Sequence, residues 1–275
     1  MSSERFSIRP ATADDIKEMS AVLERAGLSS SRPQVLEFNL AGPGTQMFVA
    51  GRDGRVTGVA GCARFGRTGW LGNVAVDDEA RGRGLGTAIS RTAVDWLHRA
   101  GVETVLLTAT ERGKPVYERL GFADEGISYG IWEQRRPLIL GGDRSATIRP
   151  GQIDEVLRQD AEATGEDRRN CLAPFAGRAW VAAGPEQAGY WGALPWGGGP
   201  VVAANAASAR PLIVEMLRTS PGSRLAFPEL NAHGAAIAVS LGFSLAGRVR
   251  RMRLGPPVSG YRPGAIFNVF SLATG

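Results

Sequence analysis

The chain has 275 residues and a formal net charge of +5 at pH 7. Hydrophobic residues at 43% and charged residues at 21% are typical of a folded globular protein and exclude disordered and fibrous chains. At roughly 150 residues per domain, this length predicts two domains. Met1 to Arg5 precede a polar segment rather than the apolar run of a signal peptide, and no stretch reaches the roughly 18 apolar residues of a membrane span. We therefore expect a cytoplasmic protein with no membrane partner.

The surplus of basic residues lacks the pattern of a nucleic-acid-binding surface. Its densest cluster, Arg248 to Arg253, alternates as the solvated face of a strand does, and the other arginines are spread along the chain. We expect no nucleic-acid partner, whereas an excess of positive charge suits an enzyme with a polyanionic cofactor. Cys62 and Cys171 have no His or Cys neighbours at ligand spacing, so we expect neither a disulfide framework nor a metal site.

The chain opens with a predicted strand and an amphipathic helix. Ile8-Arg9-Pro10 precedes Thr12-Ala13-Asp14-Asp15, a segment that resembles a capping box. Apolar residues then recur at helical spacing until Gly27, as the first two turns of the helix show with Ile16 and Met19.

Strands and helices alternate through the rest of the first half. The patterns predict strands at 47–52, 56–64 and 70–76, a helix at 84–100, a strand at 105–109, a helix at 114–120 and a strand at 128–132. The dipeptide Asp53-Gly54 marks the turn between the first two of these strands. This order predicts a mixed sheet with helices on its faces, in the α/β class.

Two short sequences of the first half occur again in the second half. Ile148-Arg149-Pro150 repeats the opening strand, and Leu241-Gly242-Phe243 repeats Leu120-Gly121-Phe122. Two tandem copies of one fold explain both repeats. The residues from Arg135 to Ser145 have the Pro, Gly and charge content of a linker, so we place the first domain at 1–140 and the second at 146–275.

A glycine-rich turn, Arg81-Gly82-Arg83-Gly84-Leu85-Gly86, lies between a predicted strand and a predicted helix. Glycines let backbone N–H groups converge on one point, and the helix N-terminus attracts negative charge, so the turn is a candidate anion site. A plain flexible turn has the same pattern. A dinucleotide-binding fold would need the turn after the first strand and an acidic residue about 20 positions later, and a nucleotide P-loop would need Gly-Lys-Ser/Thr; neither is present.

The same turn resembles the Arg/Gln-x-x-Gly-x-Gly/Ala signature of the GNAT superfamily of acyltransferases, matched here by Arg81, Gly84 and Gly86. The segment from Ala109 to Phe122 is similar to that family's closing strand-helix element, and together the matches cover roughly residues 6 to 132. The resemblance implies two tandem acyl-CoA N-acyltransferase folds, each a mixed, mostly antiparallel sheet flanked by helices. It also implies acetyl-CoA as cosubstrate and no metal. The cofactor-binding residues it implies are Val74, Ala75 and Val76 for the pantetheine arm and Arg81, Gly82, Arg83, Gly84, Leu85, Gly86 and Thr87 for the pyrophosphate.

The implied reaction is direct attack of an amine on the thioester. By the same resemblance, a backbone N–H near Val76 stabilises the charge on the carbonyl oxygen, and Tyr117 protonates the departing thiolate. A core aromatic is the alternative interpretation of Tyr117. Glu37 and Glu111 are the candidate bases, although solvated surface carboxylates fit the same positions.

The two histidines are weaker candidates for the base. His98 lies late in a predicted helix, where a residue that complements the helix dipole is common. His233 lies in the second half and stays an outside possibility.

The second half lacks the glycine turn. The segment from Val201 to Arg210, where a second turn belongs, contains no glycine, and no Tyr lies between Asn231 and Leu241. This resembles the tandem-GNAT type, with an active N-terminal copy and a degenerate C-terminal copy that is structural or binds the acceptor. The aromatic residues from Tyr190 to Trp196 are either pocket walls or core. Thr108 departs from the usual acidic residue of that type.

Three functions follow as hypotheses. The first is an N-acetyltransferase acting on the primary amine of a small molecule. The second is an N-acetyltransferase of proteins or peptides, and the third is a non-catalytic acyl-CoA sensor. The sequence leaves open whether the chain is a monomer or a homodimer.

Overall fold

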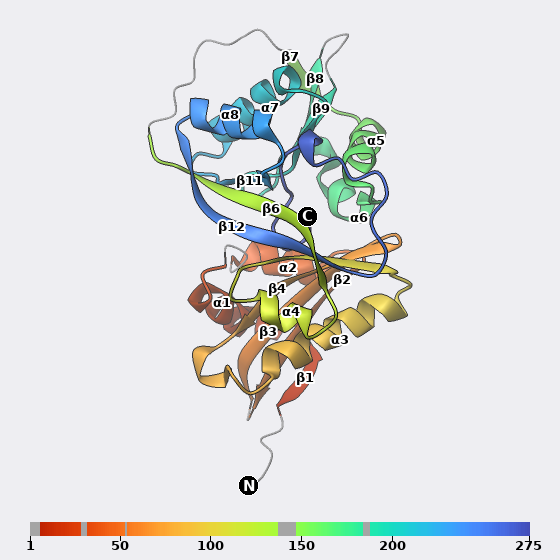
Figure 1. Ribbon diagram of the computed structural model, residues 1–275, viewed down its shortest axis with the longest axis vertical. Helices are drawn as coiled ribbons and strands as arrows, with labels where there is room; N and C mark the ends of the chain where they lie inside the picture. Colours follow the sequence, from red (N-terminus) through yellow and green to blue (C-terminus); the bar gives the residue numbers. More distant parts are fainter. Residues whose placement is uncertain (1–5, 29–31, 53, 137–146, 184–187) are drawn as a thin grey trace. The chain divides into compact units, whose positions relative to one another are not determined.

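The computed structural model describes residues 6–28, 32–52, 54–136, 147–183 and 188–275. Within them, one order of elements occurs twice: strand, two helices, three strands, helix, strand, helix, strand (Figure 1). The first series is β1 (Ser7–Pro10), α1 (Ile16–Arg25), α2 (Pro33–Ala41), β2 (Thr45–Arg52), β3 (Arg55–Phe65), β4 (Thr68–Val76), α3 (Leu85–Arg99), β5 (Thr104–Ala109), α4 (Lys114–Glu118) and β6 (Ala123–Gln134). The second is β7 (Thr147–Pro150), α5 (Ile153–Thr164), α6 (Arg169–Leu172), β8 (Ala179–Ala183), β9 (Gly189–Gly192), β10 (Val201–Ala203), α7 (Ala206–Thr219), β11 (Leu225–Pro228), α8 (Ala232–Ser240) and β12 (Phe243–Leu254).

A further strand, β13 (Ile266–Asn268), follows the second series. Short 3-10 helices cover Ala13–Asp15, Asp78–Ala80, Ala173–Arg178 and Pro263–Ala265. The α/β fold with mixed sheets and flanking helices is confirmed, and each segment predicted in the first half is present. The strand predicted at 128–132 is longer than expected, because β6 begins at Ala123. Met1 to Arg5, Asp53 and most of the predicted linker lie outside the described residues.

An arginine forms the same kind of ion pair at the start of each series. The Arg9 guanidinium donates to both carboxylate oxygens of Asp15 at 2.7 Å and to the carbonyl of the following proline at 3.2 Å. Arg149 bonds Glu155, again six residues on, and again reaches the carbonyl of the following proline at 3.2 Å. The hydrogen bonds from Arg9 and Thr12 lower the pKa of Asp15 to about 2, despite its burial. The repeated contact supports the interpretation of a duplicated fold.

The chain forms two compact units whose bounds differ from the predicted halves. Unit 1 comprises residues 1–123, 252–256 and 274, and unit 2 comprises 124–251, 257–273 and 275. The difference has one cause. Strand β6 closes the first series but belongs to unit 2, apart from its first residue, and the end of β12 closes the second series but belongs to unit 1.

Unit 1 is a sheet with helices on both faces. Its strand order is β1-β2-β3-β4-β5, followed by the last residues of β12; β1 to β4 are antiparallel, whereas β4 and β5 are parallel. Successive side chains of β2 point to opposite faces of the sheet and therefore pack in two different cores. Phe48 packs in the core that α3 covers, and Met47 packs in the core that α1 and α2 cover (Figure 1).

Unit 2 contains an antiparallel ladder and a second sheet. In the ladder, β6 lies between β11 and the main part of β12. The five-stranded sheet has the order β13-β10-β9-β8-β7. Helices α7 and α8 supply Leu212, Ile213, Met216 and Ile237 to the core of this unit.

The end of β12 is fitted closely into unit 1. Met252 is fully buried in the core beneath α3, and the Thr104 hydroxyl donates to the Pro256 carbonyl at 2.8 Å. Gly255 has a φ of +107°, and a Cβ at this position would lie 2.2 Å from the Glu103 carbonyl oxygen. Only glycine fits there without a shift of the backbone.

Gly255→Ala should therefore destabilise the protein by about 2 kcal/mol or more, through backbone strain and the clash with Glu103. The measurement is chemical denaturation followed by circular dichroism. Gly264→Ala is the matched control, since a Cβ there meets nothing within 4 Å, and its effect should stay within about 1 kcal/mol. Equal stabilities of the two variants would contradict the close fit.

Candidate functional site

The parallel strands β4 and β5 pair only at their beginnings. The paired residues are Thr68 with Thr104, Gly69 with Val105 and Trp70 with Leu106. Beyond this point β4 continues to Val76 while paired only with β3. The Asp77 N–H donates to the Thr57 carbonyl of β3 at 2.8 Å. Because neighbouring residues of a strand point their N–H and C=O groups to opposite sides, those of Val76 face away from β3. A strand edge thus lies open for hydrogen bonding.

A β-bulge interrupts this open edge. Gly72 pairs with Gly61 and Ala75 pairs with Val59, so two residues of β4 oppose one residue of β3. Asn73, one of the two, has a φ of +53° and is the one described non-glycine residue with a positive φ. Bulges turn backbone groups out of the ladder and are common beside active sites. No local sequence pattern predicts this bulge, although Asn is a residue type that tolerates the left-handed region.

The glycine-rich turn connects this edge to α3 as predicted. Gly82 and Gly84 have φ of +76° and +80°, and nothing lies within 4 Å of a Cβ placed on either. The first bond of the helix runs from the Ala88 N–H to the Gly84 carbonyl at 3.0 Å. The N–H groups of Leu85, Gly86 and Thr87 come before this first bond, so the helix itself offers them no acceptor, and no side chain caps the helix. The turn therefore offers N–H groups and the positive end of a helix dipole to open space.

Two ion pairs hold the turn in place. Arg81 donates from Nε to the Val76 carbonyl at 2.9 Å and pairs with Asp78. Asp77 is buried, and Arg25 at the end of α1 donates to both of its oxygens at 2.9 Å. No local pattern marks Asp77 as half of an ion pair, because its partner lies 52 residues earlier in the chain.

Tyr117 lies on α4 in the core beneath α3. Its ring contacts Phe122 edge to face with the centroids 6.0 Å apart, and 9% of the residue is exposed. No described residue accepts from or donates to its hydroxyl, and this oxygen is not among the enclosed, unpartnered polar atoms. Burial raises the pKa of Tyr117 to about 12, so the phenol keeps its proton at neutral pH.

The other candidate side chains lie at the surface. Glu37 on α2 and Glu111 in the turn after β5 are both exposed, and they stay predictions as bases. His98 is exposed and its Nδ1–H donates to the Val102 carbonyl at 3.0 Å, which ends α3. His233 is exposed on α8.

In the second series, strand β10 takes the position of β4 and has a neighbouring strand on both sides. Strand β10 pairs with β9 on one side and with β13 on the other. Asn268 of β13 accepts the Ala226 N–H of β11 at 2.8 Å and donates to the Gly199 carbonyl at 2.7 Å. In addition, the Asn205 side chain caps α7 by accepting the Ser208 N–H at 2.9 Å. Neither an open strand edge nor an uncapped helix start is left here for an anion.

Tyr190 and Trp191 of the second series are core residues, whereas Trp196 is half-buried. Tyr190 and Trp191 are 0% and 2% exposed, so of the two interpretations the packing role is correct for them. The Tyr190 hydroxyl donates to Asp160 at 2.5 Å, and burial raises the pKa of this tyrosine well above its ordinary value.

The described residues contain no group of three or more His, Cys, Asp or Glu that could hold a metal ion. Nor does any helix of the described ranges have the length and apolar character needed to cross a membrane.

Comparison with known proteins agrees with this geometry. The family profile described as "Acetyltransferase (GNAT) family" matches residues 14–122, which include the open edge, the turn and Tyr117. Residues 14–122 form a GNAT acetyltransferase domain. The chain is 36% identical over 67 residues to the Oryza sativa protein named "Probable glucosamine 6-phosphate N-acetyltransferase 2", a match to 24% of this chain and 40% of the relative. A second rice protein, "Glucosamine 6-phosphate N-acetyltransferase 1", is 33% identical over 69 residues, covering 25% and 42%. This chain thus spans about two fifths of the curated relatives it matches.

Solved structures extend the fold likeness beyond the GNAT domain. A Pyrococcus horikoshii protein assigned as an acetyltransferase superposes with a TM-score of 0.83 over 99% of this chain and 96% of its own, at 22% identity. A GCN5-related N-acetyltransferase from Sphaerobacter thermophilus gives a TM-score of 0.64 over 91% and 96%, at 15% identity. At these identities the likeness shows the fold.

Asn73→Val should test the bulge. A β-branched side chain at a φ of +53° costs about 1 to 3 kcal/mol of stability, so this variant should melt earlier than the wild type. Asn73→Gly should keep the wild-type melting temperature within a few degrees, because glycine adopts the same φ without strain. A Val variant as stable as the Gly variant would contradict a strained bulge.

Proposed function

We propose that this chain is an acetyl-CoA-dependent N-acetyltransferase that transfers an acetyl group to a primary amine of a small molecule. The observation that carries the proposal is the contrast between the two series. The GNAT domain has an open strand edge beside an uncapped, glycine-started helix, and the second series has neither. One copy is therefore built to bind a long polyanionic cofactor, and we assign the other a structural or acceptor-binding role.

The residues of the GNAT domain fit coenzyme A. The amides of Leu85, Gly86 and Thr87 face the open space that a pyrophosphate needs, and the glycines before them let it approach the backbone. The Val76 N–H, which faces away from β3, suits a carbonyl of a pantetheine arm, while the Val76 carbonyl already accepts from Arg81. Acetyl-CoA bound there supplies the thioester that the amine attacks.

The chain's own groups then act on the two charges that develop. A backbone N–H of β4 near Val76 donates to the carbonyl oxygen, a contact worth about 3 kcal/mol in comparable sites. Tyr117 donates its proton to the departing sulfur; burial raises its pKa to about 12, so the phenol carries that proton at neutral pH. Glu37 and Glu111 stay candidates for the base. An alkyl amine is neutral in only about one molecule in 2,500 at pH 7, a handicap of about 4.6 kcal/mol that a base removes.

The test of the proposed activity is release of free CoA thiol from acetyl-CoA with a panel of amines. Because the rice relatives are named for glucosamine 6-phosphate, amino sugars come first, followed by polyamines, amino acids and aryl amines. Turnover of one small amine supports the proposal. If only peptides are acetylated, the acceptor class is wrong. If acetyl-CoA raises the melting temperature and no amine or peptide is turned over, the chain is an acyl-CoA-binding module.

Thr87→Glu should test the pyrophosphate position. An acidic residue in the first turn of α3 suits the helix dipole but repels a pyrophosphate, so affinity for acetyl-CoA should fall at least about tenfold without loss of stability. Thr92→Glu, another half-buried threonine of the same helix, should keep wild-type affinity. Calorimetry on the wild type should give one acetyl-CoA per chain. Unchanged affinity in Thr87→Glu, or two acetyl-CoA per chain, would contradict the assignment.

Tyr117→Phe should test the proton donor. Phenylalanine fills the same buried space, so the Michaelis constant for acetyl-CoA should change little, while turnover should fall about 100-fold or more. A tyrosine loses its donor proton only as the pH rises through its pKa of about 12, so the effect of the variant should be constant from pH 7 to 10. Wild-type turnover in this variant would remove Tyr117 from the mechanism.

A further inference from the structure

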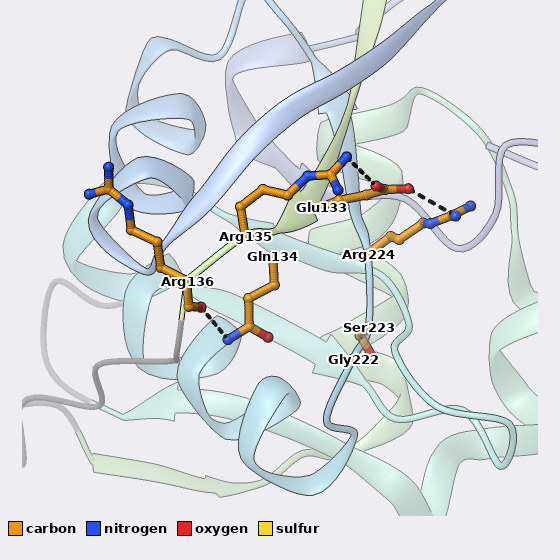
Figure 2. A pocket seen from close by; sticks show the side chains of 7 residues that line it. All are labelled: Glu133, Gln134, Arg135, Arg136, Gly222, Ser223 and Arg224. Atoms are coloured by element: carbon orange, nitrogen blue, oxygen red, sulfur yellow. Dashed lines mark hydrogen bonds and ion pairs between the residues drawn. The ribbon is translucent and has the colours of Figure 1, made fainter.

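A cavity of about 500 Å³ opens at the end of the β6–β11 ladder in unit 2 (Figure 2). Its lining residues are Glu133, Gln134, Arg135, Arg136, Gly222, Ser223 and Arg224. The volume is in the range of small-molecule sites. Every lining residue is charged, polar or glycine, so the cavity offers an apolar ligand nothing to pack against.

The register of the ladder builds this cavity. Leu225 pairs with Trp132, and the same antiparallel register continued by one residue places Arg224 opposite Glu133. The backbone N–H groups of Arg135 and Arg136 both donate to the Gly242 carbonyl, at 3.0 and 3.2 Å. The arginines are thus attached to the end of a ladder by main-chain bonds.

The charges in the cavity do not cancel. The Glu133 carboxylate uses one oxygen for Arg135 and the other for Arg224, each at 2.9 Å. The Arg136 guanidinium makes no hydrogen bond or ion pair with any described residue, and Figure 2 shows it apart from the Glu133 group. The residues that line the cavity carry three guanidinium groups and one carboxylate, a formal excess of two positive charges.

Stability alone does not explain this arrangement, because exposed ion pairs contribute little and adjacent like charges repel. A guanidinium carries five N–H donors, and Glu133 engages one nitrogen each of Arg135 and Arg224. Donors therefore remain for a ligand. Their fork geometry matches a phosphate, whose charge near −2 at neutral pH also equals the excess in the cavity.

We infer that this cavity binds the phosphate group of a small phosphorylated molecule. The site belongs to unit 2 and requires no acetyl transfer, so the inference stands apart from the proposed function. It must be distinguished from the turn at Arg81 to Gly86, which is itself suited to phosphate.

The experiment is a titration of the full chain with inorganic phosphate, followed by calorimetry at constant ionic strength and with saturating CoA to fill the turn of unit 1. The wild type should bind one phosphate per chain. Arg136→Gln and Arg224→Gln should each weaken binding about fivefold or more, because each removes one positive charge from the cavity. Glu133→Gln should strengthen binding, since it removes the one negative charge.

Arg248→Gln is the matched control. Arg248 pairs with Glu229 at 2.9 Å with side-chain exposures of 60% and 30%, close to the 58% and 27% of Arg224 and Glu133, but it does not line the cavity. It should keep wild-type phosphate affinity, and all four variants should keep wild-type CoA affinity. The inference is overturned if the CoA-saturated wild type binds no phosphate, or if Arg136→Gln and Arg224→Gln bind it as tightly as Arg248→Gln does.

Discussion

The short parallel pairing between β4 and β5 is the constraint on which the rest of the GNAT domain depends. After Trp70 and Leu106 the two strands pair no further, so the peptide groups of β4 that face away from β3 have no neighbouring strand. Unpaired backbone groups are costly when buried, and they are satisfied by water or by a ligand that bonds as a strand does. The bulge at Asn73, the uncapped start of α3 and the Arg25–Asp77 pair all lie along or next to this edge.

In the second series, the corresponding backbone groups are paired with another strand of the same chain. Strand β13 pairs with β10, and the Asn268 side chain bonds to backbone groups on both sides. An asparagine can do this because its amide carries both a donor and an acceptor on one short side chain. The two series thus differ at this edge: it is open beyond Trp70 in the first and closed by a strand of the same chain in the second.

Local features could be predicted from the sequence and long-range pairings could not. The turn at Arg81 to Gly86 and the helix that follows were predictable, because glycine conformation and helical periodicity depend on neighbouring residues. The Arg25–Asp77 pair, the β13 strand and the exchange of the last strands depend on partners far along the chain, and no local pattern encodes them. Asn73 is intermediate: its residue type permits the bulge, but only the register between β3 and β4 reveals it.

The contribution of the end of β12 to unit 1 has a consequence for synthesis on the ribosome. The hydrogen bond between Thr104 and Pro256 joins residues 152 apart, so unit 1 is completed only after residue 256 has been made. At about 5 to 20 residues per second, β5 waits roughly 8 to 30 seconds for its neighbour. During that interval a nascent strand edge and the space later filled by Met252 are accessible to other chains. The same long-range contact that completes unit 1 thus also sets how long its nascent strand edge can pair with another chain.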